Sequence, residues 1–376
     1  MKNILPRVKR KIAMKGKRIL YVASGMGHIR DFHLPYIEAL RQDGCEVKVM
    51  ASGRGADFDI PFEKKIFSRK NRECRKSIKE ILRKENFDAI ILNTTLAAYH
   101  VRRALPRNCR AKIVNVMHGY LFSADVNPVK RLLLYLAERS VRRRTDAVIT
   151  MNRRDFLFAK KKKLGKEVYF TRGMGATLRP IITPSEEIRA EYFGKDSFVM
   201  CFVGEYSGRK NQRFLIEALG EIKPHIPEAM LCLVGDGDAR AELEEMISKR
   251  GLSGSVLLTG RRSDACDFIR ASDLYVSASV IEGMPFNVIE ALGAGKTVLV
   301  SKIKGHEDLV DDGESGYLYK YGDLAEFVNK TCQIYKNNPI NPEKIRQKYL
   351  EYERETVFFE TLSVMKKAIL GGADCE

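Results

Sequence analysis

A chain of 376 residues is too long for one ordinary domain, and its 44% hydrophobic content is sufficient for two hydrophobic cores. No run of about 18 apolar residues occurs, which excludes a transmembrane helix, and the formal net charge is +18. The eight cysteines are scattered without a CxxC pair, which excludes a disulfide framework or a zinc site built on them and is typical of reduced thiols in a cytoplasmic chain.

The first half of the chain alternates short apolar runs with helical stretches. A basic N-terminal tail leads into ILYVAS, which is too short and too rich in β-branched residues for the apolar part of a signal peptide. Continuous apolar strands that alternate with helices predict a parallel sheet covered on both faces. Strands are expected at residues 19–24, 47–52, 88–94, 112–117, 146–151 and 167–172, with helices at 31–42, at 72–86 and ahead of the strands at 112 and 146.

The second half repeats this scheme. Strands are expected at 198–204, 230–235, 256–260, 273–279 and 297–301, and helices near 211–222, 238–250, 263–271, 286–294 and 322–337. The glycines and prolines of GMGATLRPIITPSEEI, between the halves, indicate a hinge. The sequence therefore predicts an α/β fold of two doubly wound, Rossmann-like domains that face a cleft. We assign residues 1–178 to the N-terminal domain and 179–353 to the C-terminal domain, and expect a final helix at 354–370 to pack on the N-terminal domain.

Two loops of the first half follow strands, where open α/β sheets bind ligands. SGMGHIRDF places Gly25 and Gly27 before a helix, so its backbone N–H groups could approach an anion or a hydroxylated ring. A plain tight turn is the alternative. In VMHGY, His118 follows a buried strand and precedes a glycine. A lone histidine is more often a packed core residue, but its position at the end of a strand favours a functional role.

Three loops of the second half carry charged residues. In VGEYSGRKN, Arg209 and Lys210 lie at the start of a helix, where they favour a diphosphate; two exposed basic side chains in a turn are the alternative. In VGDGDARAELE, Asp236 and Asp238 could bind Mg²⁺, but Asp238 is a natural N-cap and capping is favoured. In LLTGRRSD, Arg261 could face a nucleotide base or phosphate.

The stretch VIEGMPFNVIEALGAGKTVLVS contains two glutamates around a proline. Pro285 excludes an ordinary helix through Glu282, so Glu282 lies in a loop and a helix begins near Phe286–Asn287. Glu290 then lies about one turn into this helix. Two carboxylates flank the free N–H groups of a helix N-terminus, and this arrangement suits the hydroxyls and the diphosphate of a nucleotide sugar.

The same stretch, followed by KGHEDLVDDGESGYLY, resembles the most specific signature of the retaining GT-B glycosyltransferases of family 4, the glycosyl transferases group 1. VGDGDARAELE and VLLTGRRSD resemble the preceding blocks of that family. In the first half, HGYLF and PVKRLLLYLAERSVRRRTDAVITMNRRDFLFAKK are similar to bacterial enzymes that make capsular and exopolysaccharide repeat units on lipid-linked acceptors. The resemblance covers about residues 19–345.

The resemblance implies a role for each matching residue. Glu290 would bind the ribose, Glu282 the donor sugar and Lys210 the leaving diphosphate, and His118 would lie beside the donor sugar, so that His118, Lys210 and Glu282 are the catalytic candidates. The implied donor-binding residues are Gly204, Arg209, Lys210, Gly235, Arg261, Glu282, Gly283, Met284, Pro285, Phe286, Asn287 and Glu290. The implied acceptor-binding residues are Gly25, Gly27 and His28.

One position departs from the family pattern. Many members carry an arginine five residues before the lysine, where this chain has Glu205. The diphosphate is therefore expected to rely on Arg209 or Arg261. No cofactor and no metal ion are expected, because Lys210 and the helix dipole can offset the charge of the diphosphate.

The charge is unevenly distributed. Residues 1–180 contain 42 Lys and Arg against 16 Asp and Glu, a balance of +26, and residues 181–376 have a balance of −8. This asymmetry indicates an anionic partner, although a solvated basic face is the alternative. We expect an anionic membrane to contact residues 132–144 and 160–163, which would place the protein in the cytoplasm, peripheral on the inner face of the cytoplasmic membrane.

The expected function is retaining transfer of a sugar from a nucleotide-diphosphate sugar, most simply a UDP-sugar, to a lipid-linked saccharide of capsule or exopolysaccharide synthesis. Two alternatives stay open. The first is an epimerase or a phosphorylase with the same fold. The second is an RNA-binding protein that uses the basic half, but no nucleic acid partner is expected because basic and aromatic residues do not alternate as in known RNA-binding modules.

Overall fold

The computed structural model describes residues 14–63, 68–120, 127–337 and 340–371. The chain forms two compact units. Met1–Thr171 and Phe358–Glu376 make up the N-terminal unit, and Arg172–Val357 make up the C-terminal unit. The division after Thr171 lies earlier than the boundary expected at residue 178.

The N-terminal unit contains a parallel sheet of seven strands in the order β3-β2-β1-β4-β5-β6-β7. The order of the strands reverses between β1 and β4, which pair from Ile19 to Val22. The strands are β1 (Arg18–Gly25), β2 (Glu46–Ser52), β3 (Phe58–Asp59), β4 (Ala89–Leu92), β5 (Lys112–Met117), β6 (Ala147–Thr150) and β7 (Glu167–Phe170). The helices are α1 (Met26–His28), the π-helix η1 (Ile29–His33), α2 (Leu34–Gln42), α3 (Arg69–Lys84), α4 (Thr95–Ala104), α5 (Pro128–Val141), the 3₁₀-helix η2 (Arg142–Arg144) and α6 (Arg153–Lys162).

The C-terminal unit contains a second parallel sheet, in the order β10-β9-β8-β11-β12-β13, which reverses between β8 and β11. Its strands are β8 (Phe198–Val203), β9 (Ala229–Val234), β10 (Val256–Leu258), β11 (Leu274–Ser277), β12 (Val298–Ser301) and β13 (Tyr317–Tyr319). Its helices are α7 (Ser185–Ile188), the π-helix η3 (Arg189–Phe193), α8 (Gln212–Ile222), α9 (Arg240–Lys249), α10 (Ala265–Ala271), α11 (Phe286–Gly293), α12 (His306–Leu309), α13 (Leu324–Asn337) and α14 (Pro342–Leu350).

Helix α15 (Arg354–Leu370) begins in the C-terminal unit and continues in the N-terminal unit. In the N-terminal unit the ring of Phe358 packs against Tyr36 of α2, with centroids 4.9 Å apart. Lys366 forms an ion pair with Asp43, just after α2. The C-terminal part of α15 therefore packs on the N-terminal unit through an aromatic contact and an ion pair.

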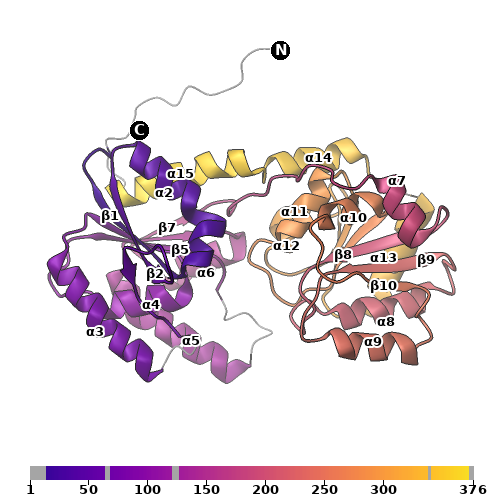
Figure 1. Ribbon diagram of the computed structural model, residues 1–376, viewed down its shortest axis with the longest axis horizontal. Coiled ribbons are helices and arrows are strands. Elements are labelled where there is room, and N and C mark those ends of the chain that lie inside the picture. Colours follow the sequence, from indigo (N-terminus) through magenta and orange to yellow (C-terminus); the bar gives the residue numbers. More distant parts are fainter. Residues whose placement is uncertain (1–13, 64–67, 121–126, 338–339, 372–376) are drawn as a thin grey trace, which may run out of the picture. The chain divides into compact units, whose positions relative to one another are not determined.

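Each sheet is buried on both faces because helices cover both of its sides (Figure 1). Central strands such as β4 (AIIL) and β11 (LYVS) are buried at every position, as the continuous apolar runs predict. The predicted doubly wound α/β fold is confirmed. Of the described helices, none is both long enough and apolar enough to cross a membrane.

Local details differ from the expectation in several places, and the helices α7, η3, α12 and α14 were not predicted. The short edge strands β3 and β13 were not predicted, because two or three residues give too weak a pattern. The helix expected from residue 31 begins as α1 and η1 and becomes regular at Leu34, beside a proline in its first turn. Asp238 does not cap α9: the N-cap is Ala239, and Asp236 instead accepts a hydrogen bond from Gly237 N.

A fully buried ion pair joins α4 to α5. Arg102 is 0% exposed, and its guanidinium donates to both carboxylate oxygens of Glu138 at 2.8 Å. It also donates to Thr145 Oγ1 at 3.1 Å and, through Nε, to Ala98 O at 3.0 Å. Because the donors of Arg102 are so completely used, removing one partner leaves a buried charge without compensation.

We predict that Arg102→Met destabilises the N-terminal unit by roughly 3–5 kcal/mol, because Glu138 remains buried without its partner. Lys166→Met is the matched control, since the Lys166–Asp146 pair is exposed and is expected to contribute about 1 kcal/mol or less. Urea unfolding followed by circular dichroism measures both. Equal losses of unfolding free energy in the two variants would show that the buried pair stabilises the protein no more than the exposed pair does.

Candidate functional site

The strand order of the N-terminal sheet reverses between β1 and β4, and a hydrogen-bonded pair of residues joins the ends of these two strands. Thr94, directly before α4, accepts hydrogen bonds at Oγ1 from Ser24 N at 2.9 Å and shares one with Ser24 Oγ at 2.6 Å. Of the predicted acceptor-binding residues, Gly25 ends β1 and Gly27 and His28 form part of α1. All three therefore lie at the topological switch point, where α/β sheets bind ligands.

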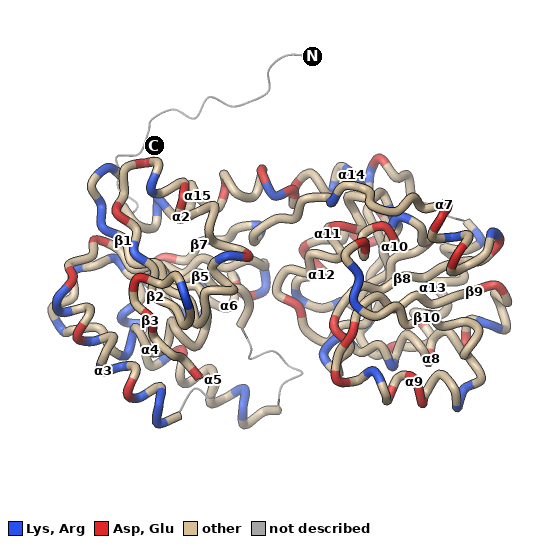
Figure 2. Tube along the Cα trace, in the orientation of Figure 1, with Lys and Arg blue, Asp and Glu red and all other residues tan. Residues whose placement is uncertain are grey.

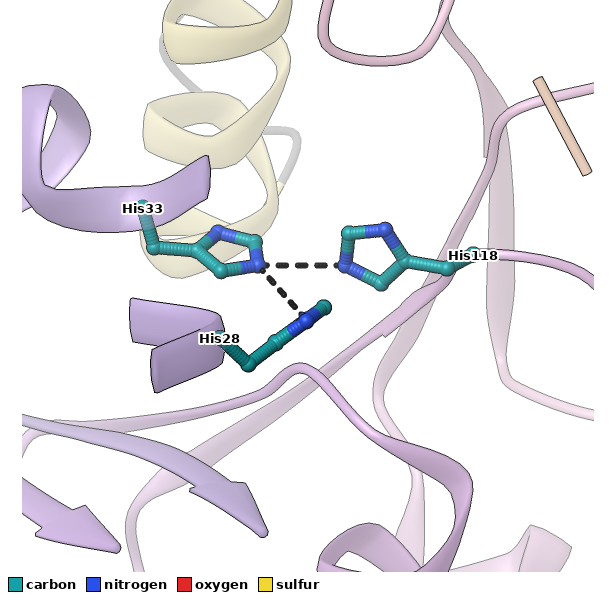
Figure 3. Close-up of side chains that lie close together, drawn as sticks. All are labelled: His28, His33 and His118. Carbon is teal, nitrogen blue, oxygen red and sulfur yellow. Dashed lines mark hydrogen bonds between the residues drawn. The ribbon is translucent and has the colours of Figure 1, made fainter. Parts of the chain in front are cut away.

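Three histidines meet at this place (Figure 3). His33 Nε2 lies 3.2 Å from His28 Nε2 and 3.1 Å from His118 Nε2. On the other side of its ring, His33 Nδ1 hydrogen bonds Tyr21 Oη at 2.9 Å. His33 is fully buried, whereas His28 and His118 are half-buried. The prediction that His118 follows the end of β5 is confirmed, and the structure brings it together with His28.

Burial keeps these histidines neutral. It lowers the pKa of His118 to about 3, and it lowers the pKa of His28, where a hydrogen bond to the Asn93 backbone partly opposes the effect. Burial also lowers the pKa of His33 well below its usual value, and a charge on either neighbouring histidine would lower it further. At neutral pH the cluster therefore presents imidazole lone pairs rather than positive charges.

Sequence reasoning missed His33. It lies five residues after His28, a spacing that an α-helix places on different sides. The intervening segment is a π-helix, whose i→i+5 hydrogen bonds form a wider turn and bring both side chains to one side. The pair of histidines in the loop after the first strand was the available signal.

The corresponding place in the C-terminal sheet carries a buried ion pair. Lys210 follows β8 and Glu282 follows β11, the two strands at the reversal, and Lys210 Nζ lies 2.6 Å from Glu282 Oε1. Both residues are buried, with 8% and 7% exposure. Arg209 is exposed and reaches Glu282 Oε2 at 3.3 Å, and its carbonyl accepts a hydrogen bond from Val280 N at 2.9 Å.

The charge on Glu282 is stabilised despite its burial. Burial alone would raise the pKa of Glu282, but the charge and hydrogen bond of Lys210 together outweigh it, so the pKa lies below the usual value. His306 lies nearby, and burial lowers its pKa to about 4. The ion pair therefore holds an ionised carboxylate and an ammonium group in a largely enclosed position.

Glu290 lies on α11, which begins at Phe286 with Pro285 as its N-cap, so the predicted loop position of Glu282 and the predicted helix start are confirmed. The Glu290 carboxylate faces Arg179 Nε at 3.5 Å. Burial raises its pKa, and the charges of Arg179 and Arg270 only partly oppose the shift. Glu282 and Glu290 thus have their pKa values shifted in opposite directions.

The remaining predicted donor-binding residues surround this place. Gly204 directly follows β8 and Gly235 directly follows β9; Gly235 has φ +146°, and a Cβ there would lie 1.9 Å from Gly204 O, so packing alone demands glycine. Asn287 hydrogen bonds Val203 O. Gly283 and Met284 lie in the half-buried loop before α11.

Arg261 and Glu205 are exposed, and neither joins the ion pair. The neighbouring Arg262 instead binds Asp264 at 2.7 Å. Of the two arginines considered in place of the missing family arginine, Arg209 contacts Glu282. Among the described residues, His28, His33 and His118 are the one set of three that could hold a metal ion, and the Asp236–Asp238 pair belongs to no such set.

Comparison with known proteins identifies the family. Residues 184–356 match the model of glycosyl transferases group 1, and residues 36–154 match that of glycosyltransferase family 4. The putative glycosyltransferase EpsD of Bacillus subtilis is 30% identical over 334 residues, which cover 85% of this chain and 87% of EpsD. The Escherichia coli UDP-Gal:α-D-GlcNAc-diphosphoundecaprenol α-1,3-galactosyltransferase is 25% identical and covers 70% of each chain.

Solved structures agree on the fold. HepE of Anabaena in complex with UDP has a TM-score of 0.70 at 21% identity, with 93% of this chain and 100% of HepE covered. Sucrose-phosphate synthase of Thermosynechococcus elongatus has a TM-score of 0.71 at 18% identity, with 94% and 98% covered. Together with the family models and the similarity to EpsD, these findings show that the chain belongs to the group 1 glycosyltransferases of family 4 and is a transferase with the GT-B fold.

Proposed function

We propose that this enzyme transfers a sugar from a nucleotide-diphosphate sugar, a UDP-sugar, to a lipid-linked saccharide acceptor with retention of configuration. The observation that carries the proposal is the buried Lys210–Glu282 pair beside the start of α11. The E. coli relative is named for a UDP-sugar donor and a diphosphoundecaprenol-linked acceptor, and HepE binds UDP in its crystal structure. The proposed role in capsule or exopolysaccharide synthesis rests on the resemblance of HGYLF and the following segment of the first half to enzymes that make such repeat units.

In this proposal the C-terminal unit holds the donor. Glu290 accepts hydrogen bonds from the ribose hydroxyls and Glu282 from the donor sugar, while the backbone N–H groups at residues 284–287 meet the diphosphate and the sugar. The N-terminal unit binds the acceptor at the loop that contains Gly25, Gly27 and His28. His118 is proposed to lie beside the donor sugar.

Binding of the nucleotide-sugar donor requires Lys210 and Glu282 to give up their contact with each other and to contact the donor instead. In the structure the ammonium group of Lys210 and the carboxylate of Glu282 pair with each other at 2.6 Å. When the donor is bound, the ammonium group faces the diphosphate and the carboxylate faces the sugar hydroxyls. In the reaction the bond between the anomeric carbon and the diphosphate oxygen breaks, the acceptor oxygen bonds to that carbon, and the acceptor proton leaves with the diphosphate. Lys210 and the N-terminus of α11 then stabilise the developing negative charge without a metal ion.

We predict that Lys210→Ala lowers kcat by roughly 10²–10³-fold while the protein stays folded, because one charge aimed at the leaving group is lost. Arg213→Ala is the control, since Arg213 lies nearby on α8 and pairs with Glu242 at the surface. Transfer from a UDP-sugar to a lipid-linked saccharide is measured, with circular dichroism to check folding. Full activity of Lys210→Ala would disprove the assignment.

The raised pKa of Glu290 predicts how UDP affinity depends on pH. Since a raised pKa means that the carboxylate is protonated earlier on acidification, UDP binding by the wild type weakens as the pH falls toward the Glu290 pKa. Glu290→Gln binds UDP about 10–100-fold more weakly at pH 8, because a charge-assisted hydrogen bond is lost, and loses this part of the pH dependence. Titration calorimetry between pH 8 and pH 5 measures both effects.

Glu244→Gln controls for general charge effects, because Glu244 pairs with Arg240 at the surface. If Glu290→Gln retained wild-type affinity at pH 8, Glu290 would have no part in nucleotide binding.

We also propose that α5 and α6 contact an anionic membrane. Val129, Leu132, Leu133 and Leu136 of α5 are between 47% and 67% exposed. With Leu157 of α6, they account for five of the large apolar side chains that remain exposed among the described residues. Arg131 and Lys162 line the groove between α5 and α6, and Figure 2 shows further Lys and Arg along α3 and α5. Apolar side chains next to cations are typical of a membrane-contacting surface.

We predict that Leu132→Glu weakens binding to vesicles that contain phosphatidylserine, because a charge replaces an apolar contact on that face. Leu350→Glu is the matched control, since Leu350 of α14 is exposed to nearly the same degree, at 54% against 55%. Vesicle co-sedimentation across increasing phosphatidylserine content measures the binding. Binding that ignored lipid charge, or equal loss in both variants, would contradict the proposed membrane surface.

A further inference from the structure

The three-histidine cluster at the N-terminal switch point resembles an open metal site. Its three ring centroids form a nearly regular triangle with sides of 4.9, 4.8 and 5.0 Å. The rings are mutually tilted by 54°, 76° and 86°, so they converge rather than stack. In Figure 3, His28, His33 and His118 point toward a common centre from two segments of the chain, the continuous α1–η1 helix and the loop after β5.

The two nitrogen–nitrogen distances from His33 fit a tetrahedral ion. Zn–N bonds of about 2.0–2.1 Å at tetrahedral angles place neighbouring ligand nitrogens about 3.3 Å apart. The two Nε2–Nε2 distances from His33 are 3.2 and 3.1 Å, and the ligand atoms of all three residues lie within 4.8 Å of one another. Binding of an ion would draw the nitrogens of His28 and His118, which lie within 4.8 Å of each other, toward this same spacing.

Hydrogen bonding among the histidines alone does not fully account for the geometry. An imidazole nitrogen offers either one N–H group or one lone pair in the plane of the ring. His33 Nε2 contacts two other Nε2 atoms, so it can form only one of these contacts as a linear hydrogen bond. A metal ion would accept all three lone pairs at once, and burial already favours the neutral state that ligation requires.

The surroundings supply the outer contacts of a metal site. With Nε2 used for the ion, the His33 proton resides on Nδ1 and is donated to Tyr21 Oη at 2.9 Å. Such partners orient histidine ligands and fix their tautomer. His28 and His118 are only half-buried, so an ion can enter and a fourth position stays open to water or a hydroxyl group.

We propose that His28, His33 and His118 form a binding site for a divalent transition-metal ion, with Zn²⁺ the ion that best fits three imidazoles and an open fourth position. This site departs from the sequence-based expectation that the chain uses no metal. It lies within the N-terminal unit and does not depend on which donor the C-terminal unit binds.

The test is metal binding by the full-length, untagged protein after chelator treatment. We expect the wild type to bind one equivalent of Zn²⁺ in a competition titration, and His28→Gln and His118→Gln to bind it at least tenfold more weakly. His225→Gln is the matched control, because His225 is exposed and lies outside the cluster. Equal Zn²⁺ binding by the wild type and the two ligand variants would overturn the proposal.

Two further measurements test whether the bound ion is held by the three histidines. Tyr21→Phe retains the ring packing but removes the hydrogen bond to His33, and is expected to weaken Zn²⁺ binding about 10–100-fold, which a purely structural cluster would not show. Co²⁺ is expected to give visible absorption of a nitrogen-ligated site. A thiolate charge-transfer band would instead assign the ion to one of the free cysteines and would overturn the proposal. Circular dichroism verifies folding of each variant.

Discussion

Both candidate sites depend on one constraint of parallel sheets. All strands of such a sheet end at the same edge, and where the strand order reverses, the loops after the two central strands turn away from each other in opposite directions. The reversal between β1 and β4 makes room for the histidine cluster and the Ser24–Thr94 pair. The reversal between β8 and β11 makes room for Lys210 and Glu282. The positions of the functional groups thus follow from topology before any individual contact is considered.

The two buried ion pairs differ in how many of their hydrogen-bonding groups already have partners, and this difference distinguishes a structural pair from one that can bind a ligand. Arg102 and Glu138 use nearly all of their donors and acceptors on each other and on adjacent groups, which is typical of a pair that fixes the packing of two helices. Lys210 and Glu282 share one short contact and a second from the exposed Arg209. The second pair can be separated by a ligand that offers each charge a new partner, whereas no ligand has room to do this for the first.

Most of the fold could be predicted from the sequence because apolar strands and their turns give a strong periodic signal. The loop position of Glu282 and the helix start at Phe286 followed from Pro285 alone. Several features of the fold were not predicted. The short strands β3 and β13 contain too few residues to give a recognisable pattern. The prediction that Asp238 caps α9 was wrong because this helix begins two residues later, at Arg240. In the candidate site, the direct contact between Lys210 and Glu282 requires the pairing of β8 with β11, which one sequence does not specify.

The π-helix Ile29–His33 determines how this segment would respond to the deletion of a residue. A π-turn contains one residue more than an α-turn, so deletion of a single residue would let the segment relax into a regular α-helix without losing the sheet or α2. His33 would then rotate by roughly 100° about the helix axis, away from His28 and His118. The histidine cluster therefore depends on the length of this segment as well as on its histidines, and a related chain shorter by one residue here would keep the fold without the cluster.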